Sequence, residues 1–207
     1  YSKEEPYLRV ISGICKGLPI KAVPGSNTRP TTDKVKESIF NMIGPYFEGG
    51  LAVDLFAGSG SLGIEALSRG IDTCIFIEKD AKAIQTIHEN LKKCHLEEQA
   101  EVFRVDALRA IKAMEKRELT IDLLFLDPPY HKADLYDLVG ILAEKGLLSS
   151  DAMIMCEHEK TVNLPGYYHD FILSRRETYG STVISIYRKL NEEGDLHEEN
   201  RSSTGQF

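Results

Sequence analysis

Short apolar runs alternate with stretches of helical apolar spacing from residue 51 onwards. This alternation predicts repeated β-α units, in which parallel strands form a sheet covered by helices on both faces. Strands are expected at 51–56, 73–77, 101–105, 121–126 and 152–156, and helices at 62–67, 80–91, 107–115 and 135–142. The run Ile121–Leu126 is nearly all apolar, which is typical of a parallel strand buried on both faces.

The two ends of the chain follow other patterns. Two short strands, at 8–11 and 18–23, precede a helix that begins near Thr32 or Asp33 and ends at Gly44-Pro45. After residue 166, strands at 170–175 and 181–187 predict an antiparallel pair that ends the sheet. Residues 191–207 are polar and aperiodic, and we expect them to be disordered. The expected division is an N-terminal extension (1–46), an α/β domain (47–190) and an acidic tail (191–207).

Composition places the chain among ordinary globular proteins. It has 207 residues, of which 42% are hydrophobic and 28% charged. No apolar run approaches the ~20 residues of a membrane span, and no signal peptide opens the chain. The four cysteines form no Cys-x-x-Cys pair, and the six histidines show no ligand spacing. We therefore expect a cytoplasmic protein without disulfides, metal or membrane segments.

Charge is distributed unevenly along the chain. The net charge is −7, but the tail alone holds five acidic residues against one basic residue. Residues 1–36 hold seven basic against three acidic residues, and residues 171–190 hold four against one. Two basic segments at the ends of the folded body favour a polyanionic partner.

A glycine-rich turn lies between the first predicted strand of the α/β region and the helix after it. Residues 53–63 contain Gly-x-Gly-x-x-Gly, in the strand-to-helix context of a nucleotide-binding loop. The pattern alone allows a dinucleotide or an adenosyl cofactor. Asp54, at the end of the strand, would repel a pyrophosphate and would suit the ammonium group of S-adenosylmethionine. Glu78 suits the ribose of either cofactor. Asp106 either faces the adenine or caps a helix.

A proline corner follows the buried fourth strand. Asp127-Pro128-Pro129-Tyr130 should lie beside the glycine turn, because the fourth strand should neighbour the first. The prolines fix the backbone and remove N–H donors. The corner then displays a carboxylate, a free carbonyl and a ring. These groups suit an exocyclic amino group on a base, on which Tyr130 can stack.

Three segments together resemble one family. Residues 54–63, 65–70 and 127–130 look like the bacterial 16S ribosomal RNA guanine-N(2)-methyltransferases of the RsmD type. The segment 29–40 is similar to the one that precedes the methyltransferase core in that family. The glycine and proline motifs are shared by many amino methyltransferases, whereas residues 29–40 and 61–70 point to this family. The resemblance covers about residues 8–189.

The resemblance implies a Rossmann-like S-adenosylmethionine-dependent methyltransferase fold, so that residues 47–190 form the methyltransferase domain. It also implies a guanine in the small ribosomal subunit as target, and hence 16S ribosomal RNA or the small subunit particle as partner. We expect a monomer, although the sequence does not give the oligomeric state. The cofactor would be bound by Asp54, Phe56, Gly58, Ser59, Gly60, Glu78, Asp106 and Ala107. The base would meet Asp127, Pro128, Pro129 and Tyr130, and the RNA would be gripped by Arg9, Lys16, Lys21, Arg29 and Thr31.

Other functions remain open from the sequence. An adenine amino methyltransferase acting on DNA or RNA, or a methyltransferase acting on a protein glutamine amide, would use the same corner. A dinucleotide-dependent oxidoreductase would leave residues 127–130 unexplained. A non-catalytic RNA-binding module would require that no cofactor binds.

Overall fold

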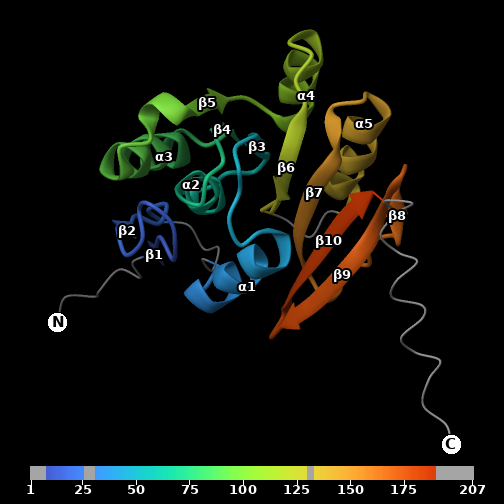
Figure 1. The fold of residues 1–207 in the computed structure, drawn as a ribbon, viewed down its shortest axis with the longest axis horizontal. Helices are drawn as coiled ribbons and strands as arrows, with labels where there is room; N and C mark the ends of the chain where they lie inside the picture. Colours follow the sequence, from blue (N-terminus) through green and yellow to red (C-terminus); the bar gives the residue numbers. More distant parts are fainter. Residues whose placement is uncertain (1–7, 26–30, 130–132, 190–207) are drawn as a thin grey trace, which may run out of the picture.

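A single eight-stranded sheet forms the centre of the molecule (Figure 1). The computed structural model describes residues 8–25, 31–129 and 133–189. The strand order is β5-β4-β3-β6-β7-β10-β9-β8. The strands from β5 to β7 are parallel, whereas β10, β9 and β8 are antiparallel to their neighbours. Their bounds are β3 Leu51–Asp54, β4 Thr73–Glu78, β5 Ala100–Arg104, β6 Ile121–Leu126, β7 Leu148–Glu159, β8 Tyr167–Tyr168, β9 Phe171–Tyr179 and β10 Thr182–Lys189.

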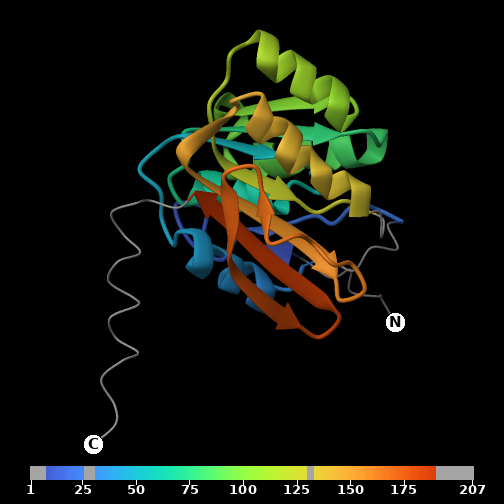
Figure 2. The ribbon, with the colours of Figure 1, turned by 90° about the vertical axis from the view of Figure 1, so that its right-hand side faces the viewer.

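Helices cover both faces of this sheet (Figure 2). On one face, helices α1, α2 and α3 pack on one set of strand side chains, and on the other face α4 and α5 pack on the alternate set. The helices are α1 Asp33–Ile43, α2 Ser61–Ser68, α3 Ala81–Cys94, α4 Ala107–Lys116 and α5 Leu138–Glu144. Short 3₁₀ turns lie at Glu97–Gln99 and Ala133–Asp137. The mostly parallel sheet predicted from the sequence is confirmed.

The N-terminal extension packs on the sheet as part of the same hydrophobic core. Its two strands, β1 Leu8–Arg9 and β2 Pro19–Ile20, are shorter than predicted. After β1 the chain passes so close to the end of α2 that a Cβ at Gly13, which has φ +85°, would lie 1.8 Å from the Ser68 carbonyl oxygen. Helix α1 begins as predicted, with the Thr32 hydroxyl accepting a hydrogen bond from the Val35 amide. Apolar residues of the extension share the core cluster with α2 and α3, among them Leu8, Val10, Cys15 and Ile20.

The C-terminal strands extend further than their apolar runs predicted. Strand β7 continues past Cys156 because its end pairs with β10, where Glu157 faces Ile184 and Glu159 faces Thr182. The predicted antiparallel pair is confirmed as β9 and β10, joined by a turn at Gly180 with φ +62°. The predicted helix at 135–142 begins instead as the 3₁₀ turn and becomes α-helical at Leu138.

Neither disulfides nor membrane-spanning helices occur in the described part of the chain. All four cysteines are free and buried: Cys15, Cys74, Cys94 and Cys156. No helix within residues 8–189, as far as they are described, combines the length and apolar character needed to cross a bilayer. The predicted tail, residues 191–207, lies outside the described residues.

Candidate functional site

The predicted site residues converge at the carboxyl edge of the parallel strands. Asp54 ends β3, Glu78 ends β4 and Asp127 follows β6. Strand β3 lies between β4 and β6, with Asp54 opposite Phe76 on one side and Phe125 on the other. The fourth parallel strand therefore neighbours the first, as predicted, and the glycine turn lies beside the proline corner.

The backbone of the glycine turn allows neighbouring groups to approach it closely. Gly60 precedes α2 with φ +80°, which disfavours any residue with a side chain. A Cβ at Gly63 would lie 2.3 Å from the Phe76 ring, so only glycine lets α2 pack this closely on β4. A Cβ at Gly58 would meet no atom within 4 Å, so this side of the turn is open to a ligand.

Glu78 holds the glycine turn against the end of β4. Its Oε2 accepts a hydrogen bond from the Gly58 amide at 2.9 Å. Its Oε1 accepts from the amides of Lys79 at 2.7 Å and Asp80 at 3.0 Å. The side chain remains partly exposed, so its free lone pairs stay available to hydroxyl donors.

Asp54 is a buried carboxyl group with an unsatisfied oxygen. Its side chain is 1% exposed, and Oδ1 has no hydrogen-bond partner among the residues that the structure describes. Burial and the nearby charge of Glu78 raise the Asp54 pKa to about 7, although the backbone amides of Gly63 and Phe56 oppose the shift. Such an oxygen, beneath a glycine turn, fits the ammonium group of an amino-acid-bearing cofactor.

Asp106 caps a helix in this structure. Its Oδ1 accepts from the Arg109 amide at 3.0 Å at the start of α4, and Ala107 is the first residue of that helix. The Val105 amide donates to the Glu78 carbonyl at 3.0 Å, which places Asp106 next to the end of β4. The helix cap that the sequence left open is thus observed, and contacts of Asp106 and Ala107 with adenine remain predictions.

The proline corner presents Asp127 beside two other acids. Asp127 is partly exposed, Pro128 is buried and Pro129 is exposed. Although the residue is partly exposed, protein atoms surround its carboxyl group, and this desolvation raises the Asp127 pKa well above its usual range; the charges of Glu157 and Asp54 raise it further. Tyr130 lies outside the described residues.

Glu157 is a site residue that the sequence reasoning missed. It follows the apolar run of β7, and the Thr31 hydroxyl donates to its Oε2 at 3.1 Å. Burial raises its pKa, and the hydrogen bond from Thr31 opposes that shift. An acidic residue directly after a predicted parallel strand was the signal, and it is the same signal that identified Glu78 and Asp127.

The predicted RNA-binding residues lie on or near the extension. Arg9 is exposed and forms an ion pair with Asp33, and Lys21 contacts Glu89 at 2.7 Å. Lys16 is exposed, whereas Arg29 lies outside the described residues. Thr31 differs from the others, because its hydroxyl donates to Glu157. Glu157, Asp127 and Asp54 lie at the carboxyl edge, and we call them the acid cluster.

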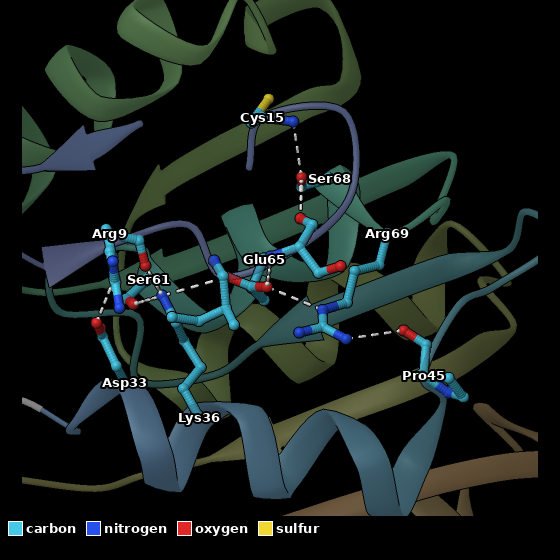
Figure 3. Close-up of polar contacts among 11 residues, drawn as sticks. Arg9, Cys15, Asp33, Lys36, Pro45, Ser61, Glu65, Ser68 and Arg69 are labelled. Carbon is cyan, nitrogen blue, oxygen red and sulfur yellow. Dashed lines mark hydrogen bonds and ion pairs between the residues drawn. The ribbon is translucent and has the colours of Figure 1, made fainter. Parts of the chain in front are cut away.

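Lys36, counted among the basic residues of the extension, is not available to a surface partner. It is 1% exposed, and its Nζ donates to the Arg9 carbonyl at 2.6 Å and lies 3.2 Å from Glu65 (Figure 3). The Glu65 carboxylate also binds Arg69 at 2.8 Å and accepts from the amides of Ile11 and Ser12. We call Lys36, Glu65 and Arg69 the buried ion network. It joins the extension, α1 and α2 directly behind the glycine turn.

Comparisons with known proteins agree with this geometry. The family model described as conserved hypothetical protein 95 matches residues 8–188. The Bacillus subtilis protein YlbH is 55% identical over 182 residues, which cover 88% of this chain and 99% of that protein. The Haemophilus influenzae ribosomal RNA small subunit methyltransferase D is 37% identical over 183 residues, which cover 87% and 93%.

A solved structure shows the same fold. Escherichia coli yhhF superposes with a TM-score of 0.77 at 31% identity, over 88% of this chain and 98% of that one. The Rossmann-like methyltransferase fold and the resemblance inferred from residues 29–40, 54–70 and 127–130 are thereby confirmed. The chain belongs to the RsmD family, the family of the ribosomal RNA small subunit methyltransferases D.

Proposed function

We propose that this chain transfers a methyl group from S-adenosylmethionine to the exocyclic amino group (N2) of a guanine in 16S ribosomal RNA. The observation that carries the proposal is the pairing of β3 with β6, which sets a cofactor-type glycine turn beside an amine-binding corner. Relatives named as ribosomal RNA small subunit methyltransferases support the choice of RNA.

The residues around the glycine turn fit the cofactor. The unsatisfied Oδ1 of Asp54 suits its ammonium group, and Glu78 suits the ribose hydroxyls. Phe56, Gly58, Ser59 and Gly60 would contact the cofactor, with Gly58 on the open side of the turn, and Asp106 with Ala107 would border the adenine. When bound, S-adenosylmethionine supplies an electrophilic methyl group on a sulfonium.

The corner prepares the amine to attack. An exocyclic amine on guanine is a poor nucleophile because its lone pair is delocalised into the ring. Asp127 and the Pro128 carbonyl can accept its two protons, which favours a pyramidal nitrogen with a localised lone pair. The raised pKa of Asp127 also makes its carboxylate a better acceptor for the proton that the nitrogen loses. Pro129 keeps the corner rigid, and Tyr130 would stack on the base.

The RNA would approach across the extension. Arg9, Lys16, Lys21 and Arg29 would contact phosphates, and Thr31 lies at the entrance to the acid cluster. We propose that the enzyme acts as a cytoplasmic monomer, and that its substrate is 16S RNA or the small subunit particle. An adenine or a protein glutamine amide, acting at the same corner, is the alternative substrate.

Nucleoside mass spectrometry tests the proposal. Ribosomal RNA is taken from a strain that lacks the gene, and from that strain complemented with wild type or with Asp127→Ala. The proposal expects N2-methylguanosine to be lost on deletion and restored only by wild type. Purified enzyme with labelled cofactor, given naked 16S RNA or 30S particles, then identifies the substrate form. Loss of N6-methyladenosine, or label on protein, would refute the guanine assignment.

A further inference from the structure

A second carboxyl group, that of Glu157, lies beside Asp127 and has no task in the function proposed above. Strands β6 and β7 run parallel with Leu126 opposite Cys156, so Asp127 and Glu157 are the next pair of neighbouring positions. Phe125 and Met155, two residues earlier, both belong to the core cluster beneath α1–α3. Because side chains alternate along a strand, the Glu157 carboxyl group lies on that face of the sheet, and it is near enough for its charge to raise the pKa of Asp127.

Glu157 is held from two elements. The Thr31 hydroxyl, from the segment before α1, donates to its Oε2 at 3.1 Å. The Tyr136 hydroxyl, from the turn before α5, donates to its backbone carbonyl at 2.5 Å. Thr31 occupies only one carboxylate oxygen, so Oε1 keeps its acceptor capacity. The side chain is therefore oriented without being fully satisfied.

The two neighbouring acids lack a cation of their own within the described ranges. None of the ion pairs found there includes Asp127 or Glu157. Burial raises the pKa of both groups, and the charge of Glu157 raises the pKa of Asp127 further. Hydrogen-bond donors from a bound group would stabilise the ionised pair. Two adjacent acceptors suit a ligand with two adjacent donors.

The Watson–Crick edge of guanine carries this arrangement of donors. Guanine presents N1–H next to its N2 amine, and both are donors. Adenine presents its amine next to N1, which is an acceptor and would repel a carboxylate. A glutamine amide has no counterpart to N1–H. A second acceptor beside the amine-binding corner therefore discriminates among the substrates that the corner alone would accept.

We propose that Glu157 accepts a hydrogen bond from N1–H of the target guanine while Asp127 and the Pro128 carbonyl hold its N2 amine. Thr31 is a positioning residue that orients the Glu157 carboxylate. This assignment rests on the proposed function and explains how the site selects guanine. It also gives the segment before α1 a task at the base as well as at the phosphates.

The test compares two purines at one position. The target guanine is located by mass spectrometry of nuclease fragments, and RNA carrying guanine or 2-aminopurine there is assembled by splinted ligation. 2-Aminopurine keeps the 2-amino group and lacks N1–H. We expect wild type to methylate guanine about tenfold faster or more in single turnover. Glu157→Gln should bring the ratio near one, because its amide can donate to N1 of 2-aminopurine.

Matched variants separate this role from a structural one. Glu144→Gln removes the same charge at the end of α5, on the other face of the sheet, and should leave the ratio unchanged. Thr31→Val should lower the ratio, and Thr31→Ser should restore it. Cofactor affinity, measured by calorimetry, should stay within about twofold for every variant, so that a misfolded protein is recognised.

The outcomes distinguish a failure of the Glu157 assignment from a failure of the proposed function. If wild type methylates both purines equally, or if Glu157→Gln keeps the wild-type ratio, Glu157 does not contact N1 and only this inference fails. If Thr31→Val keeps the ratio, Thr31 does not position Glu157. If wild type methylates no guanine RNA at all, the proposed function fails and this inference with it.

Discussion

The molecule buries charge in two regions that differ in how the charge is satisfied. In the buried ion network, Glu65 is 0% exposed and binds two cations and two backbone amides. At the carboxyl edge of the parallel strands, Asp54, Asp127 and Glu157 carry charges of the same sign, and Oδ1 of Asp54 has no hydrogen-bond partner among the described residues. The first region has opposite charges within hydrogen-bonding distance, whereas none of the ion pairs among the described residues includes an acid of the second region.

This difference separates a structural task from a binding task. Hydrogen bonds and opposite charges compensate the desolvation of Glu65, so the network holds the extension and α1 against α2. Burying like charges without opposite charges or hydrogen-bond donors lowers the stability of the folded state. Such groups are typical of functional sites, where a bound ligand supplies the donors. Removing a charge should therefore destabilise the first region, whereas in the second region it should reduce binding or catalysis without loss of stability.

The largest effect is expected from Glu65→Gln. It leaves Lys36 and Arg69 buried without a counter-charge, and breaking a buried pair in this way costs roughly 3–5 kcal/mol. Urea unfolding followed by circular dichroism measures the free energy of unfolding. Glu101→Gln, which removes the exposed partner of Arg117, is the control and should cost less than about 1 kcal/mol. Equal losses for the two variants would refute the structural role of the network.

Asp127→Ala should abolish most of the methylation activity without lowering the stability of the fold. Losing one preorganised acceptor at the reacting nitrogen should slow single-turnover methylation by ~10²–10³. Cofactor affinity should change by no more than a few-fold, because in the proposed function Asp127 contacts the substrate amine and not the cofactor. The free energy of unfolding should stay equal or rise, since one of the like charges is removed. Near-wild-type turnover would show that the corner is structural.

Asp54→Asn should trade stability against cofactor binding. The pKa of Asp54 is raised to about 7 in the folded chain, so between pH 4 and 7 the folded state binds more protons than the unfolded state. Wild type should therefore lose up to a few kcal/mol of stability as pH rises through this window and then level off.

The variant should lose the part of this pH dependence that Asp54 contributes, while the parts from Asp127 and Glu157 remain, and it should be more stable than wild type at pH 8. It should also bind S-adenosylmethionine more weakly, because the ammonium loses its carboxylate. Unfolding at several pH values and titration calorimetry measure the two effects. A variant that is less stable at pH 8 would contradict the view that Asp54 is buried against its own preference.

The smallest effect on stability is expected from replacing Arg9, Lys16 and Lys21 with alanine. Exposed ion pairs contribute little, so the free energy of unfolding should change by less than about 1 kcal/mol. RNA affinity should fall, and the slope of log K against log salt should flatten by ~0.7–0.9 for each phosphate that the variant no longer binds. Filter binding over a range of salt concentrations measures both. Unchanged RNA affinity at low salt would show that these residues of the extension do not bind the RNA.

The sequence predicted those parts of the fold in which local pattern and burial agree. Ile121–Leu126 is a strand with the predicted bounds because it is buried on both faces. Asp80 and Thr32 cap helices as their types indicate. The bounds of β7 were wrong because its last residues are held by pairing with β10, a contact between segments about 25 residues apart.

The site residues were predictable where an acidic residue stands at or directly after the end of a parallel strand. Asp54, Glu78 and Asp127 were found in this way, and Glu157 was overlooked although the same rule applies to it. The buried ion network was not predictable, because Lys36 on α1 and Glu65 on α2 meet only after the sheet brings the two helices together. In the sequence, Lys36 is indistinguishable from a surface lysine of a basic segment.

The four buried cysteine thiols can report which part of the structure opens first. Cys15 lies in the extension, and its thiol donates to the Cys94 carbonyl at the end of α3. Cys74 and Cys156 lie in the interior of β4 and β7. A thiol reagent modifies each one only when the surrounding structure opens. The order of labelling, followed by mass spectrometry in native buffer, therefore reveals whether the N-terminal extension detaches while the central sheet remains closed.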